Sequence, residues 1–163
     1  MDLTDYEWLV GDDGRRALEE ALPLETQESL LPLTARLRKE HSAHRAHLLI
    51  EQLTQRRRAR QKFERAGEMY FTPVALEQAT DEIVARYKAS RFPPRVAVAD
   101  FCCGIGGDAL GLALACDEVR GFDRNPVHAL FAAVNVGVYL EQAGLPRARF
   151  RATTAEMAAC DGR

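Results

Sequence analysis

The chain has 163 residues, of which 47% are hydrophobic, so it is long and apolar enough to bury a core and is not a disordered tail. Its net charge is only −2, but residues 1–28 carry nine acidic and two basic side chains, whereas residues 29–65 carry ten basic and three acidic ones. This asymmetry is typical of a partner-binding surface or of neighbouring helices that attract one another. The N-terminus lacks the apolar stretch of a signal peptide, no run approaches the ~20 apolar residues of a membrane span, and the four cysteines have neither disulfide nor zinc-site spacing. We therefore expect a soluble cytoplasmic protein with reduced thiols.

The first 92 residues are expected to form a helical domain. An amphipathic segment over residues 3–10 stops at Gly11, and a second helix is expected to end at Pro23. Pro32 is expected to break or kink the segment that follows, because proline lacks the N–H of a helix interior.

Two longer helices are expected in the rest of this region. Ser42 is a suitable N-cap for a helix that reaches about Ala66 and ends at Gly67. Thr72 followed by Pro73 favours a new helix start, because the hydroxyl accepts from a free N–H and proline has none to lose. We expect that helix to continue to the "RFPPR" linker near residue 92.

Beyond residue 92 the pattern changes to alternating strands and helices. Strand, helix, strand, helix and strand are expected at 95–100, 107–115, 118–123, 125–144 and 147–153. This order predicts an α/β domain with a parallel, doubly wound sheet. We place the domain boundary near residue 92, with 1–92 as the helical domain and 93–163 as the α/β part.

The stretch "VADFCCGIGGDALG" joins the first strand to the first helix of that part. Asp100 ends the strand, and a turn with three glycines follows it. Asp123 ends the second strand, where a carboxylate can accept both hydroxyls of a ribose. Because ligands of such sheets lie at the carboxyl ends of the strands, these features predict a nucleotide-like ligand.

Two cofactors compete for this site. "GIGGDA" satisfies the dinucleotide fingerprint G-x-G-x-x-A, but Asp100 would repel a pyrophosphate at the helix N-terminus. S-adenosylmethionine carries a sulfonium and an ammonium and no phosphate, so the carboxylate favours it. A dinucleotide, or a fold that has lost its ligand, remains the alternative.

These residues resemble motifs I and II of class I S-adenosylmethionine-dependent methyltransferases. The pattern is most similar to the trimethylguanosine-synthase-like group, and "QKFERAGEMYFTPVALEQAT" resembles the segment before the methyltransferase domain in bacterial proteins with a C-terminal THUMP-like domain. The resemblance covers about residues 55–155 and is more specific for the cofactor than for the substrate. It implies a helical domain followed by the first half of a Rossmann-like domain, with strands 1–3 of the sheet.

The resemblance also implies a set of cofactor-binding residues. Asp100 and the backbone around Gly104 would flank the methionine part, Asp123 would hold the ribose, and Thr154 or Glu156 would replace a usual aspartate near the adenine. The full implied set is Phe71, Thr72, Asp100, Cys102, Cys103, Gly104, Gly106, Asp123, Arg124 and Asn125.

No catalytic residue is assigned. Nitrogen-methylating members of this class have an (Asn/Asp)-Pro-Pro-aromatic turn after the fourth strand, and the sequence contains only Pro93–Pro94, before the first strand. We therefore expect an N-terminal fragment of a longer methyltransferase, or a natural truncation, that lacks the catalytic motif. Without a fourth strand, the apolar first strand would have an open edge, through which we expect self-association or contact with the helical domain.

RNA is the expected methyl acceptor. The run "QRRRARQKFER" places Arg56, Arg57, Arg58 and Arg60 where they can contact phosphates, although a solvated helix face has the same pattern. The run "HSAHRAH" lacks an acidic residue in a recognised metal-binding spacing, so no metal site is expected. A dinucleotide oxidoreductase and a non-catalytic RNA-binding or scaffold module remain alternative functions.

Overall fold

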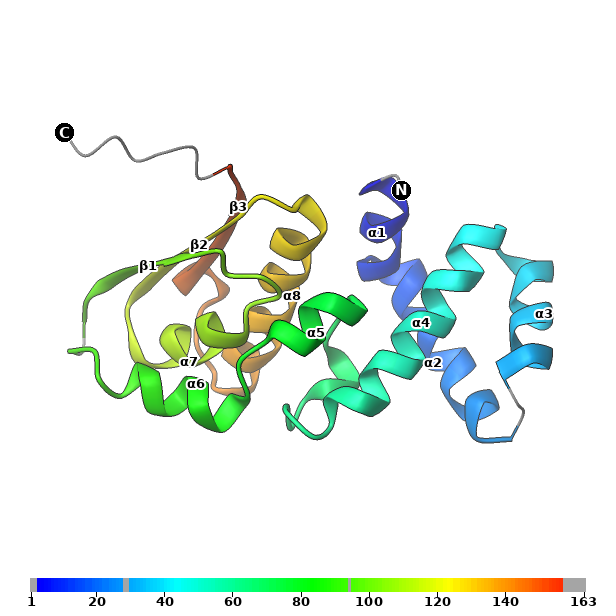
Figure 1. Ribbon diagram of the computed structural model, residues 1–163, viewed down its shortest axis with the longest axis horizontal. Helices are drawn as coiled ribbons and strands as arrows, with labels where there is room; N and C mark the ends of the chain where they lie inside the picture. The colour runs from blue at the N-terminus through cyan, green and yellow to red at the C-terminus, as the bar shows by residue number, and fades with distance from the viewer. Residues whose placement is uncertain (1–2, 28–29, 94, 157–163) are drawn as a thin grey trace.

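The computed structural model of the protein describes residues 3–27, 30–93 and 95–156. The first part is helical (Figure 1), and Asp5 near the N-terminus contacts two residues of the basic segment. Asp5 accepts a hydrogen bond from Arg45 Nε at 2.9 Å and lies 2.6 Å from His44 Nδ1, and these two contacts lower the pKa of Asp5. The helices are α1 (Leu3–Val10), α2 (Asp12–Gln27), α3 (Leu30–Glu40) and α4 (Ala43–Ala59).

Neither Pro23 nor Pro32 ends or interrupts a helix, contrary to expectation. Helix α2 continues past Pro23 to Gln27, because loss of one backbone hydrogen bond need not end a helix that packs against α3 and α4. Pro32 lies in the first turn of α3, where its missing N–H would have no partner within the helix.

The N-caps follow the sequence more closely than the helix ends do. Ser42 caps α4 as expected, but α4 ends at Ala59 rather than near Ala66, because the chain turns there to bury Phe63. Thr72 and Pro73 start α5 (Pro73–Gln78) as expected. The single long helix is wrong: Asp81 caps a separate helix, α6 (Glu82–Ala89).

The second part confirms the expected α/β fold. Three parallel strands pair in the order β1-β2-β3, with Asp100 opposite Gly121 and Phe122 opposite Thr153. The elements are β1 (Ala97–Phe101), α7 (Gly107–Ala115), β2 (Glu118–Asp123), α8 (Pro126–Gln142) and β3 (Phe150–Thr154), with short 3-10 turns at Ala66–Glu68 and Arg147–Arg149.

The helices cover one face of the sheet. Helices α7 and α8 pack against the strands, and α6 packs against α7 (Figure 1). On the opposite face Ala97, Ala99 and Phe101 of β1 are exposed, together with Arg120 of β2. Buried residues from both sides of residue 92 form one contiguous core, so the helical part and the sheet are packed together. Among the described residues, no helix combines the length and apolarity needed to cross a bilayer.

The outer edge of β1 predicts how the 163-residue chain associates. No strand in the described part of the chain pairs with that edge, and apolar open edges pair with other chains. Ala97→Lys places a charge on β1 and should raise the monomer fraction measured by light scattering. Thr153→Lys adds the same charge to β3, the other edge strand of the described sheet, and so tests whether association is specific to β1. A monomeric unmodified chain, or equal effects of the two variants, would contradict this prediction.

Candidate functional site

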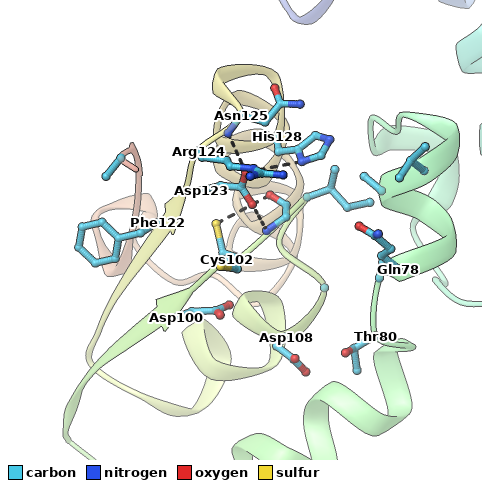
Figure 2. Close-up of a pocket in the computed structure, with 18 of the residues that line it drawn as sticks. Gln78, Thr80, Asp100, Cys102, Asp108, Phe122, Asp123, Arg124, Asn125 and His128 are labelled. Carbon is cyan, nitrogen blue, oxygen red and sulfur yellow. Dashed lines mark hydrogen bonds and ion pairs between the residues drawn. The ribbon is translucent and has the colours of Figure 1, made fainter. Parts of the chain in front are cut away.

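A cavity of about 640 Å³ lies at the carboxyl ends of β1 and β2. Its volume is typical of sites for small organic ligands. One side is formed by the loop between β1 and α7, and the other by α5 and the turn into α6 (Figure 2). Among the residues expected to bind a cofactor, those that line the cavity are Asp100, Cys102, Cys103, Gly104, Asp123, Arg124 and Asn125.

The loop over the cavity depends on left-handed backbone conformations. Cys102 has φ 62°, Gly104 has φ 54° and Gly106 has φ 88°. A Cβ on Gly106 would also lie 3.0 Å from a methyl carbon of Val136 and 3.3 Å from the Cα of Ala132, both in α8. Gly106 thus allows the loop to lie close to α8 and does not line the cavity, whereas Gly104 does.

Asp123 organises this loop. Its Oδ2 accepts a hydrogen bond from the N–H of Gly104 at 2.9 Å, and its Oδ1 accepts one from the N–H of Asn125 at 2.8 Å. His128 Nδ1 lies 3.6 Å from the same Oδ1 (Figure 2). Each carboxylate oxygen keeps a second lone pair, so Asp123 can shape the loop and still accept from a ligand.

Asp100 carries an unsatisfied negative charge. Its Oδ2 is buried and has no hydrogen-bond partner among the described residues. Burial raises the pKa of Asp100 to about 6, the nearby Asp108 raises it further, and Lys88 opposes the shift. Lys88 is itself paired with both oxygens of Asp108 at 2.9 Å. The cavity therefore has a carboxylate that a cation would stabilise (Figure 2).

The neighbouring thiols differ in exposure. Cys103 and Cys116 are buried, and Cys102 is exposed at the cavity. Burial raises the pKa of Cys103 to about 12, and the charge of Asp100 adds to this effect. Cys102 is therefore the thiol in this loop that reagents can reach.

The segment containing Phe71 and Thr72 lies behind the cavity wall rather than on its surface. The Phe71 side chain is fully buried, and Thr72 caps α5 and lies 3.4 Å from His128 Nε2. Neither residue lines the cavity. The helix that they start supplies the wall instead, through Val74, Ala75 and Gln78, followed by Ala79 and Thr80.

Asp108, Phe122 and His128 are among the further lining residues that were not identified from the sequence. Asp108 follows the glycine turn, His128 lies in the first turn of α8, and Phe122 is next to Asp123. Each lies next to a recognised motif in the sequence, and this position is the signal that could have identified it as a lining residue. Of the two candidates after the third strand, Glu156 lines the cavity and Thr154 does not.

The basic run is divided between interior and surface. Arg56 Nε donates to the carbonyl of Met69 at 2.9 Å, and its guanidinium lies 4.8 Å from the centre of the Tyr70 ring. Arg58 contacts Gln55 and Glu77 through its guanidinium. Arg57, Arg58 and Arg60 are exposed, whereas Arg56 is half-buried, so the four arginines do not share one surface.

The histidines of "HSAHRAH" have other contacts. His44 is close to Asp5, and the His41 ring lies 5.4 Å from the Trp8 ring. Within the described residues, no group of three or more His, Cys, Asp or Glu side chains is placed to hold a metal ion.

Comparison with known proteins supports the fold. Residues 2–59 match a family described as "Domain of unknown function (DUF8688)", and the match ends at the last residue of α4. No curated protein sequence is significantly similar to this chain. A solved structure described as "putative methyltransferase from Porphyromonas gingivalis W83" superposes with a TM-score of 0.58 and 21% identity, covering 68% of this chain.

The chain therefore has a methyltransferase-like fold. It spans 27% of the length of the Porphyromonas protein, and the low identity makes this a statement about fold rather than about activity.

The buried charge of Asp100 predicts a conflict between stability and binding. Its pKa in the folded chain is about 6, above the ordinary 3.8, so the folded state binds the proton more tightly. The ionised carboxylate therefore costs folding free energy above pH 6, and this cost disappears as the pH falls towards 4. Asp100→Asn should stabilise the chain at pH 7.5 by on the order of 1–3 kcal/mol.

Urea denaturation at pH 7.5 and pH 4.5 measures this effect. The stability gain of Asp100→Asn should shrink at the lower pH, and Glu20→Gln, which neutralises an exposed carboxylate on α2, should have little effect at either pH. A destabilised Asp100→Asn at pH 7.5 would show that the charged form is already compensated.

Proposed function

We propose that this chain binds S-adenosylmethionine and supplies the cofactor-binding part of a methyltransferase. The observation that carries the proposal is the buried, unpaired oxygen of Asp100 in a cavity at the carboxyl end of a parallel sheet. S-adenosylmethionine offers an ammonium and a sulfonium to such a carboxylate and supplies an activated methyl group. The finer resemblance to the trimethylguanosine-synthase-like and THUMP-like groups belongs to this proposal as well.

The residues of the cavity fit this cofactor in charge and shape. Asp100 would hold the cationic methionine part, and Asp123 has lone pairs left for the ribose hydroxyls. Arg124, Asn125 and Glu156 lie beside Asp123 on the cavity wall, where the adenine would lie. The chain's own contribution to methyl transfer is to bind and orient the donor, which is how positioning lowers a displacement barrier.

The negative charges at the glycine loop argue against a dinucleotide. A pyrophosphate binds at a helix N-terminus that has free N–H groups and no negative charge nearby. The N–H groups of Cys103, Gly104 and Gly106 already donate to Phe122 O, Asp123 Oδ2 and Cys103 O. Asp108 in the first turn of α7 adds a negative charge at the same place.

Direct binding tests the cofactor. By calorimetry, S-adenosylhomocysteine, which retains the ammonium, should bind more tightly than NAD. Asp100→Asn should weaken this binding about tenfold, because a charge-assisted hydrogen bond becomes a neutral one. The same ligand should slow alkylation of Cys102, measured by peptide mapping, while Cys103 stays unreactive in both states. Tighter binding of NAD, or unprotected Cys102, would exclude this cofactor assignment.

RNA is the proposed methyl acceptor, and the exposed arginines of α4 and the following turn are its proposed contacts. Combined Ala substitution of Arg57, Arg58 and Arg60 should weaken RNA binding and reduce its salt dependence by about 0.7–1 unit of slope for each lost phosphate contact. Combined Ala substitution of Arg36, Arg38 and Lys39, all exposed on α3, is the charge-matched control. Equal effects of the two variants would indicate general charge attraction and not a binding site.

A further inference from the structure

The backbone of residues 70–71 is held between two buried side-chain amides. Gln52 of α4 donates through Nε2 to the carbonyl of Phe71 at 2.7 Å and accepts from the Phe71 N–H at 2.9 Å. Asn135 of α8 makes the matching pair with Tyr70, at 2.7 and 2.9 Å. Both amides have a relative exposure of 0%, so no water can replace these bonds without opening the core.

Lys62 binds the C-terminal end of α5, the helix that follows residues 70–71. Lys62 Nζ donates to the carbonyls of Leu76, Glu77 and Ala79 at 2.9, 3.0 and 2.9 Å. An ammonium has three donors, so this side chain is fully used in capping the C-terminal end of α5. Helix α5 has six residues, which is too short to be stable by itself.

These contacts fix the wall of the cavity opposite the glycine loop. That wall consists of residues from α5 and the turn after it, between the backbone held by Gln52 and the carbonyls held by Lys62. We infer that Gln52 and Lys62 are positioning residues of the cofactor cavity, an inference that rests on the proposed function. Since Gln52 lies in residues 2–59, this assigns the DUF8688 region a role in shaping a ligand site outside its own helices.

The role differs from ordinary core packing. An apolar contact tolerates small shifts, whereas a side-chain amide that pairs both polar groups of one residue fixes that residue's position and orientation. Loss of the hydrogen bonds of Gln52 or of Lys62 leaves backbone groups of the wall segment unpaired. The wall can then move relative to the loop that carries Asp100.

The test compares binding with stability in the full chain. Gln52→Met keeps the size of the side chain and removes both hydrogen bonds. It should weaken binding of S-adenosylhomocysteine by ~5–20-fold. Binding is measured by calorimetry at a temperature where circular dichroism shows that the variant is folded. Lys62→Met is the second variant, at a half-buried site, and should weaken binding by ~3–10-fold. Leu37→Ala, in the α3–α4 interface, is the control: it should lower the Tm at least as much and leave the affinity unchanged.

Each outcome has a separate meaning. If Gln52→Met does not fold, Lys62→Met decides the question. Unchanged affinity in the folded variants, or an equal loss in Leu37→Ala, overturns the positioning role alone. Failure of the unmodified chain to bind S-adenosylhomocysteine overturns the proposed function, and this inference falls with it.

Discussion

The side-chain amide of Asn135 is the contact on which the arrangement of the cavity depends. It is completely buried in α8, pairs with the backbone of Tyr70, and also donates to the carbonyl of Ile105 at 3.0 Å. One side chain thus joins the helical part of the chain, the α8 layer and the glycine loop. A buried amide with its partners satisfied specifies one arrangement, because any shift leaves polar groups unpaired in the core. Asn135 thus fixes the relative positions of the two cavity walls, which come from different parts of the sequence.

The sequence predicted best those site residues whose relative positions are set by local structure. Asp100, Gly104 and Asp123 lie within one strand–turn–helix–strand unit, and the turn and strand ends place them together regardless of the remaining chain. The resemblance placed Phe71 and Thr72 at the cofactor, but it did not identify the α5 residues that form the second wall. The position of that wall depends on long-range bonds such as those of Gln52 with Phe71, which no periodicity in the sequence records. The helix ends were also wrong at Pro23 and near Ala66, since tertiary packing and the burial of Phe63 decided them.

The basic run shows how composition alone can mislead. Its charges are dense in sequence, but the structure turns Arg56 onto the Met69 carbonyl and Lys62 onto the end of α5. Arg56 is half-buried, and desolvation lowers the pKa of its guanidinium. Cations at such positions stabilise carbonyl groups that a short helix and a turn leave unpaired. The basic run is therefore partly internal scaffold, and its exposed arginines are Arg57, Arg58 and Arg60.

Asp5 and Asp100 show how neighbouring charges change the pKa of a carboxyl group in opposite directions. Asp5 is half-buried beside His44 and Arg45 and its pKa falls, whereas Asp100 is half-buried near a second carboxylate, Asp108, and its pKa rises. Lys88 Nζ donates to both carboxylate oxygens of Asp108, whereas Asp100 Oδ2 has no hydrogen-bond partner among the described residues. A ligand with its own positive charge, such as the proposed cofactor, would supply the missing partner of Asp100.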